Sequence, residues 1–134
     1  MYRFKKQNDE FRDDIAILSD ILKDTTSFIH GFIGDYLYFY AEKVDDKRVE
    51  IIDESDFMYS VVIEPELKDI SPHYELVNKR VLEKIRSLYS LEEELKIQRL
   101  RDIEPDEFND FYNWCESCRA WGREQKNLMG FITE

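Results

Sequence analysis

Helix-start signals divide residues 71–129 into three helical segments, and they constrain the fold more than any other feature of this sequence. Ser71-Pro72 begins the first segment, because serine can accept an unpaired amide hydrogen of the first turn and proline tolerates that position. Ser90, with Glu93 three residues later, has the spacing of a capping box. Residues 104–107 (Glu-Pro-Asp-Glu) begin the third, since their acids complement the positive end of a helix dipole. The sequence therefore predicts three consecutive helices.

Apolar residues recur at helical spacing in these segments, which predicts faces that are buried. In the short middle segment we expect Leu91, Leu95 and Leu100 to point inward. The first and third segments carry longer stripes, and the third is mostly aromatic. Their members are Tyr74, Val77, Val81, Ile85 and Leu88, and then Phe108, Phe111, Trp114 or Cys115, Cys118, Trp121 and Leu128.

The first half of the chain is typical of one helix and a small sheet. Residues 2–5 alternate as a short edge strand would, and residues 9–23 place apolar side chains on one helical side. Two glycines, Gly31 and Gly34, indicate a bent or closely approached backbone. Further on, a meander of about three antiparallel strands is predicted from alternating β-formers. These strands are expected at residues 36–40, 49–51 and 57–63, with Pro65 ending the last.

The fold class predicted from these elements is α+β, with a small antiparallel sheet of three to four strands packed against the C-terminal helices and one N-terminal helix. A chain of 134 residues can bury roughly two thirds of its unfolded surface without metals or disulfides. We expect a single domain over residues 1–134, in which residues 1–66 form the helix and meander and residues 71–129 the helical part. The helices are expected to close over the sheet as one compact body.

The charge of the chain disfavours direct binding of nucleic acid. Its net charge is −11, and residues 1–70 carry 17 acids against 9 bases, whereas residues 71–134 carry 13 against 10. A field of that sign repels phosphates.

No run approaches the ~18 to 20 apolar residues of a membrane span. Residues 1–7 are basic without an apolar run behind them, so no signal peptide is predicted and we expect folding in a cytoplasm.

No catalytic, metal or cofactor signature is evident, and we expect a non-enzymatic protein without a cofactor. Cys115 and Cys118 are spaced like zinc or redox cysteines, but they lie well inside a predicted helix and lack further soft ligands nearby. We interpret them as packing residues. His30 and His73 have no recognisable nucleophile partner and are interpreted as structural residues. The acidic clusters lack the spacing of a calcium loop.

An interface with another protein is the site hypothesis that the last helix favours. Trp114 and Trp121 are seven residues apart on one helical face, with Arg119 and Arg123 beside them. Tryptophan and arginine are enriched at binding hot spots. A stacking platform for bases or sugars is the less favoured interpretation of the same pair.

Part of the C-terminal half resembles a known group of proteins. The resemblance comprises a basic helix ending in Arg-x-x-Tyr-Ser, a short Glu-rich helix with Leu-x-x-x-Arg, a Pro-x-Glu-Phe turn and an aromatic helix with a cysteine. In this sequence these are residues 85–99 and 104–118. The order is similar to the C-terminal part of small proteins of tailed phages and prophages, which are often encoded near tail or tail-fibre genes. The resemblance implies an assembly chaperone or a minor virion component, and it assigns no functional residue.

The resulting functional hypothesis is a non-enzymatic phage tail-module protein that contacts another phage protein in the host cytoplasm or the virion. Its own oligomeric state is left open. The alternative is a small acidic phage inhibitor or DNA mimic that blocks a nucleic-acid-binding protein of the host, which requires contiguous carboxylates spaced like phosphates. A third hypothesis is a cytosolic bacterial domain unrelated to phage, which the neighbouring genes would distinguish.

Overall fold

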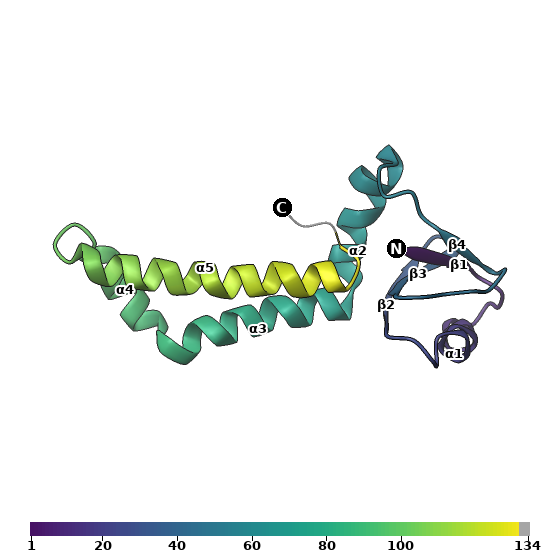
Figure 1. Cartoon of the computed structure of the whole chain (residues 1–134), viewed down its shortest axis with the longest axis horizontal. Coiled ribbons are helices and arrows are strands. Elements are labelled where there is room, and N and C mark those ends of the chain that lie inside the picture. The colour runs from purple at the N-terminus through teal and green to yellow at the C-terminus, as the bar shows by residue number, and fades with distance from the viewer. Residues whose placement is uncertain (132–134) are drawn as a thin grey trace.

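A four-stranded antiparallel sheet and a long helical hairpin make up the structure, a computed structural model that describes residues 1–131 (Figure 1). The sheet order is β2-β3-β1-β4. The strands are β1 (Tyr2–Lys5), β2 (Ser27–Ile33), β3 (Tyr36–Ala41) and β4 (Val49–Ile51). The helices are α1 (Phe11–Ile21), a π-helical turn η1 (Tyr59–Ile63), α2 (Glu64–Ile70), α3 (Pro72–Leu88), α4 (Leu91–Arg99) and α5 (Pro105–Leu128). The α+β prediction is confirmed.

The two faces of the sheet carry different cores, because successive side chains of a strand point to opposite sides. On one face Phe4, Leu37 and Phe39 pack against Leu18 and Leu22 at the end of α1. The other face is covered by helical elements from the second half of the chain. Its buried cluster includes Tyr38, Tyr59, Leu67, Val77, Met129 and Phe131.

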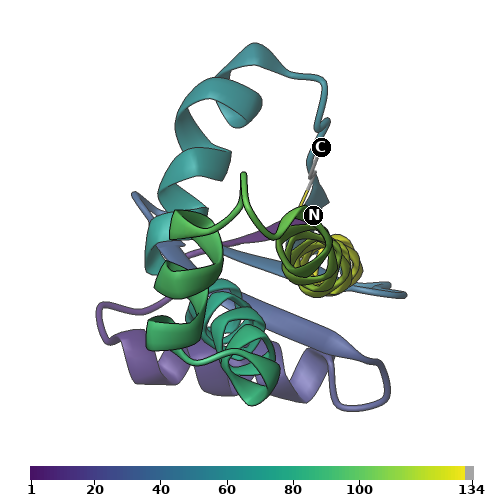
Figure 2. The same ribbon diagram turned by 90° about the vertical axis from the view of Figure 1, so that its left-hand side faces the viewer.

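The C-terminal helices pack on the sheet only through their near ends. Val77 and Met129 belong to the core beside the sheet, whereas Ile85 and Phe111 belong to a separate cluster farther out between α3 and α5. Figure 1 shows this hairpin extending well away from the sheet, and Figure 2 looks along it from its distal end. The expectation that the helices close over the sheet as one compact body is therefore wrong, because most of the hairpin's length contacts only its own helices.

The predicted capping signals begin the helices where expected. The Ser71 hydroxyl accepts from the Tyr74 amide at the start of α3. At α4, the Glu93 amide donates to the Ser90 hydroxyl and the Ser90 amide donates to the Glu93 carboxylate, so the capping box is complete.

The predicted strand over residues 57–63 is wrong, because this segment is helical. Asp56 accepts a hydrogen bond from the Met58 amide, 2.8 Å long, at the beginning of the helical backbone. Pro65, expected to end a strand, lies in the first turn of α2. A proline removes one helical hydrogen bond and crowds the preceding turn, and the wider π-helical turn directly before it accommodates both effects.

The segment with Gly31 and Gly34, for which only a bent backbone was expected, contains most of the edge strand β2. The pairing of β2 with β3 shifts between Ile29 and Gly31, which is a β-bulge. Gly31 has a φ of 151°, and a Cβ there would lie 2.9 Å from the Ile70 side chain. The close approach inferred from this glycine is therefore present, but within a strand.

Two further expectations are corrected by the tertiary structure. The strand β1 is not an edge strand, since it pairs with both β3 and β4. In α4, Leu91 and Leu95 are 56% and 58% exposed, and Ile97 packs against the hairpin core in their place. The sheet and the hairpin both need partners that lie far away in the sequence, so local spacing could not decide either point.

Candidate functional site

The predicted interface residues of α5 are largely engaged within the hairpin. The Trp114 indole donates to the Lys84 carbonyl oxygen over 3.3 Å, and the Lys84 ammonium lies 4.6 Å from the centre of the Trp121 ring. Both indoles are half-buried against α3. Arg119 is exposed and pairs with Glu116 at 2.7 Å, and Arg123 is half-buried. The four residues thus share α5, and the tryptophans serve helix packing as well as any external contact.

The two cysteines are buried and free, as their interpretation as packing residues expects. Cys115 and Cys118 lie with Ile85 and Phe111 in the distal cluster of the hairpin. Burial raises the pKa of both thiols, which disfavours the reactive thiolate. Within residues 1–131, no three His, Cys, Asp or Glu side chains are grouped so that they could hold a metal ion.

His30 has a serine partner that its sequence context does not reveal. Its Nδ1 lies 2.7 Å from the Ser71 hydroxyl oxygen, and its Nε2 lies 2.9 Å from the Met129 carbonyl oxygen. Because a carbonyl can only accept, Nε2 carries the proton, and Nδ1 accepts from Ser71, whose oxygen in turn accepts from the Tyr74 amide. Burial lowers the pKa of His30 to about 4.

This histidine–serine pair has the geometry of a structural link between segments. Both side chains are at most 2% exposed, so a substrate has no access to them. The hydroxyl already caps α3, and the second ring nitrogen binds a backbone carbonyl instead of an orienting carboxylate. The pair joins β2, the start of α3 and the end of α5, which supports the structural interpretation of His30.

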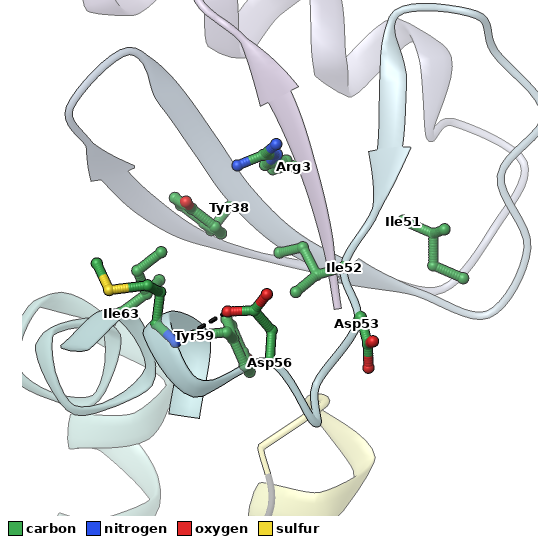
Figure 3. Close-up of a pocket in the computed structure, with 9 residues that line it drawn as sticks. Arg3, Tyr38, Ile51, Ile52, Asp53, Asp56, Tyr59 and Ile63 are labelled. Carbon is green, nitrogen blue, oxygen red and sulfur yellow. Dashed lines mark hydrogen bonds between the residues drawn. The ribbon is translucent and has the colours of Figure 1, made fainter. Parts of the chain in front are cut away.

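A cavity of about 300 Å³ lies where the sheet meets the start of the helical half (Figure 3). We call it the junction pocket. On the sheet side it is lined by Arg3, Tyr38, Ile51 and Ile52. On the helical side its walls are Asp53, Asp56, Met58, Tyr59 and Ile63. Figure 3 shows Arg3 and Asp56 on opposite sides of Ile52, with Tyr38 facing them from β3.

The one cation of the junction pocket is already compensated. The Arg3 Nε donates to Glu50 over 2.7 Å, and the guanidinium carbon lies 4.0 Å from the centre of the Tyr36 ring. Partial burial opposes a rise in the pKa of Arg3, but the interactions with Glu50 and Tyr38 outweigh it and raise that pKa. Arg3 is therefore held in place by its own neighbours on the sheet.

In the junction pocket Asp53 stays charged at neutral pH, and the Tyr59 hydroxyl has no partner among the described residues. Hydrogen bonds from Ser55 lower the pKa of Asp53. Tyr59 is 2% exposed, and its buried hydroxyl has no hydrogen-bond partner among the described residues. Burial, together with nearby carboxylates, raises the pKa of Tyr59. A buried polar group without a partner is unusual in a folded protein.

The sequence did not predict the junction pocket, because the segment that forms half of it was interpreted as a strand. Residues 57–63 alternate in a way that fits a strand, and only the helical backbone brings Met58, Tyr59 and Ile63 to face the sheet. Asp56 carried the one available signal, since an aspartate ahead of an apolar run can cap a helix.

Exposed apolar side chains gather at the end of the hairpin that lies farthest from the sheet. We call them the distal surface: Leu88, Leu91, Leu95, Ile103 and Tyr112. Each is more than half exposed, and Ile103 reaches 76%. They come from the end of α3, from α4, from the following loop and from the beginning of α5 (Figures 1 and 2). Leu91 and Leu95 share one face of α4, because residues four apart are neighbours on a helix.

Comparisons with protein families, with curated proteins and with solved structures find no match for this chain. None of the helices in residues 1–131 combines the length and apolar character that crossing a membrane requires.

Proposed function

We propose that this protein is a non-enzymatic component of a phage tail module and acts by binding another phage protein, during tail or tail-fibre assembly or in the virion. The distal surface is the observation that carries the proposal. Five large apolar side chains, each more than half exposed, occur together on a small protein with a net charge of −11. Exposed apolar groups that cluster in this way are typical of protein interaction sites.

The shape of the molecule supports the same proposal. The hairpin holds the distal surface away from the sheet, so that a partner can reach it without contacting the rest of the chain. The cluster behind it, formed by Ile85, Phe111 and the two cysteines, supports the helices that present it. A helical face of this kind suits recognition by a groove or another helix.

The resemblance of residues 85–99 and 104–118 to small phage proteins supplies the class of partner. Four of the five residues of the distal surface lie in these two ranges, and Ile103 lies between them. A tail or tail-fibre protein is therefore the partner proposed, with the host cytoplasm as the place of assembly. Neither a cofactor nor nucleic acid is needed for this function.

The acidic-inhibitor alternative receives less support from the arrangement of charges. Bases are interspersed with the acids of the N-terminal half, whereas a DNA mimic needs a contiguous row of carboxylates. Ion pairs in this half include Arg3–Glu50, Arg12–Glu10 and Arg48–Asp46.

The proposal is tested by affinity capture of the phage tail and tail-fibre proteins, combined with mass spectrometry of purified virions. We expect a tail or fibre protein to be captured by the wild-type chain. Leu91→Glu combined with Leu95→Glu should abolish capture while leaving the fold intact, since both side chains are exposed.

A matched control places two glutamates elsewhere on the same hairpin. Leu76→Glu combined with Leu82→Glu adds the same charge on exposed positions of α3 outside the distal surface. This variant should still capture the partner. Absence of the protein from virions, together with failure to capture any tail or fibre protein, would overturn the proposal.

A further inference from the structure

The junction pocket lies at the opposite end of the molecule from the distal surface and has a different chemistry. Its walls are apolar and aromatic, and its rim carries two carboxylates, Asp53 and Asp56, against one guanidinium. Arg3 is neutralised in place by Glu50. The balance of charge within reach of an incoming group is therefore negative, in a protein whose net charge is already −11.

The polar groups of the pocket are placed to receive hydrogen-bond donors. One carboxylate oxygen of Asp56 accepts a hydrogen bond from the Met58 amide, and its second oxygen can accept another. The Tyr59 hydroxyl takes no part in binding, because it is buried and closed to a ligand. A ligand with a cationic N–H donor can bind this second oxygen of Asp56.

The size and the walls restrict the ligand further. A cavity of about 300 Å³ is at the small end of ligand pockets and suits a single long side chain better than a cofactor. Ile52, Met58 and Ile63 provide apolar surface for an aliphatic stem. Lysine and arginine combine such a stem with a cationic donor at its tip.

We propose that the junction pocket is a second docking site, which receives one exposed lysine or arginine side chain of a partner protein. The inference rests on the proposed function in that the partner is a protein, and it adds the chemistry by which that partner is recognised. The negative field of the molecule would draw such a basic partner toward the pocket.

The test uses blocked amino acids, so that it is independent of the partner's identity. N-acetyl-L-lysine methylamide and N-acetyl-L-arginine methylamide are titrated at millimolar concentration into the isotope-labelled full chain, and backbone amide NMR shifts are followed. We expect saturable shifts at Arg3, Tyr38 and Tyr59. N-acetyl-L-norleucine methylamide has the same stem as lysine without the ammonium and should cause no saturable shift.

Substitutions separate the roles of the polar groups. Asp56→Asn keeps an acceptor for the Met58 amide but removes the negative charge. It should reduce the affinity for N-acetyl-L-lysine methylamide by about fivefold. Asp45→Asn removes the same charge from an exposed position outside the pocket and should leave affinity unchanged. Tyr59→Phe removes a buried hydroxyl that the ligand does not reach and should leave binding unchanged.

The response to Arg3→Gln distinguishes a cationic ligand from an anionic one. Loss of the guanidinium should strengthen binding of lysine methylamide, whereas a site for anions or zwitterions would be weakened. Three results would each overturn the inference. They are equal shifts with the norleucine and lysine methylamides, no shift with either compound, and weaker binding of lysine methylamide to the Arg3→Gln variant. Any of these results would leave the proposed function intact, because that proposal is tested separately by capture of a tail or fibre protein through the distal surface.

Discussion

At the scale of single residues, His30 shows how one side chain can join distant parts of a chain. It links β2 to the first turn of α3 through Ser71 and to the end of α5 through the Met129 carbonyl. Each of its nitrogens has one specific role, so the network requires the neutral ring. Protonation would place two donors against the Ser71 hydroxyl and the carbonyl, and the hydroxyl would have to give up its hydrogen bond to Nδ1.

We predict that the free energy of unfolding decreases as pH falls from 6.5 to about 4. In the unfolded chain His30 binds a proton near its ordinary pKa of 6.5, whereas burial lowers the pKa to about 4 in the folded chain. The unfolded state binds more protons between these values, so stability present above pH 6.5 is lost across the window. The loss attributable to His30 is up to about 3 kcal/mol. Urea unfolding at a series of pH values measures it.

The His30→Gln variant is the control for this dependence on pH. Glutamine keeps a donor and an acceptor but does not titrate, so its stability should change less steeply over the same window. Carboxylates that protonate in both proteins cancel in the comparison. Identical slopes for the two proteins would show that His30 does not carry the effect.

Tyr59→Phe is predicted to leave stability unchanged or to raise it by about 1 kcal/mol. The hydroxyl is buried without a hydrogen-bond partner among the described residues, so its removal relieves a desolvation cost and breaks no bond. Chemical denaturation measures the change. A loss of more than about 1 kcal/mol would mean that the hydroxyl has a partner in solution, such as an ordered water.

At the scale of elements, the helix starts of the second half follow directly from local chemistry. Ser71 and Ser90 both cap helices as their spacing predicts. The interpretation failed at residues 57–63, where apolar residues recur at every second position but the chain is helical. Phe57 and Val61 are 72% and 52% exposed there, so the alternation does not mark a buried face. The burial that decides the element comes from Tyr59 and Leu67, which pack on the sheet.

Gly122→Ala is predicted to destabilise the hairpin by about 1 kcal/mol in spite of the higher helix propensity of alanine. A Cβ at this position would lie 2.6 Å from Val81 Cγ2, which forces α3 and α5 apart. Alanine recovers up to about 1 kcal/mol of that cost through helix propensity. Thermal and urea unfolding measure the net change.

The same substitution should have the opposite sign in a Val81→Ala background. With Val81 shortened, the space next to residue 122 is open and the alanine should stabilise the protein. A double-mutant cycle isolates this coupling. Additive effects of the two substitutions would contradict the close packing of Gly122 on Val81.

At the scale of the whole molecule, the sheet and the distal hairpin differ in how much buried surface holds them. The sheet has a core on each face, whereas the distal cluster contains Ile85, Phe111, Cys115 and Cys118 as its buried members. Stability in such a molecule is not uniform, since segments with fewer buried contacts open at lower free energy. The proposed partner would bind at the less stable end.

We predict that amides of α4 and of residues 106–112 exchange with solvent more than about tenfold faster than those of β1 and β3. Native-state hydrogen exchange followed by NMR gives these rates. In the complex with a partner bound to the distal surface, protection of α4 should rise. Equal rates in α4 and β1 would indicate that the chain opens as one cooperative unit.

The sequence by itself determined the helix starts of the second half, the α+β class and the packing role of the cysteines. These depend on interactions within three or four residues, or on a periodicity that a short stretch contains. Tertiary structure alone decided that β1 lies between β3 and β4, that residues 57–70 are helical, and that Leu91 and Leu95 face solvent. It also formed the junction pocket and brought Ser71 to His30. Each of these depends on partners many residues away, and burial against them outweighs the weaker preference of the local chain.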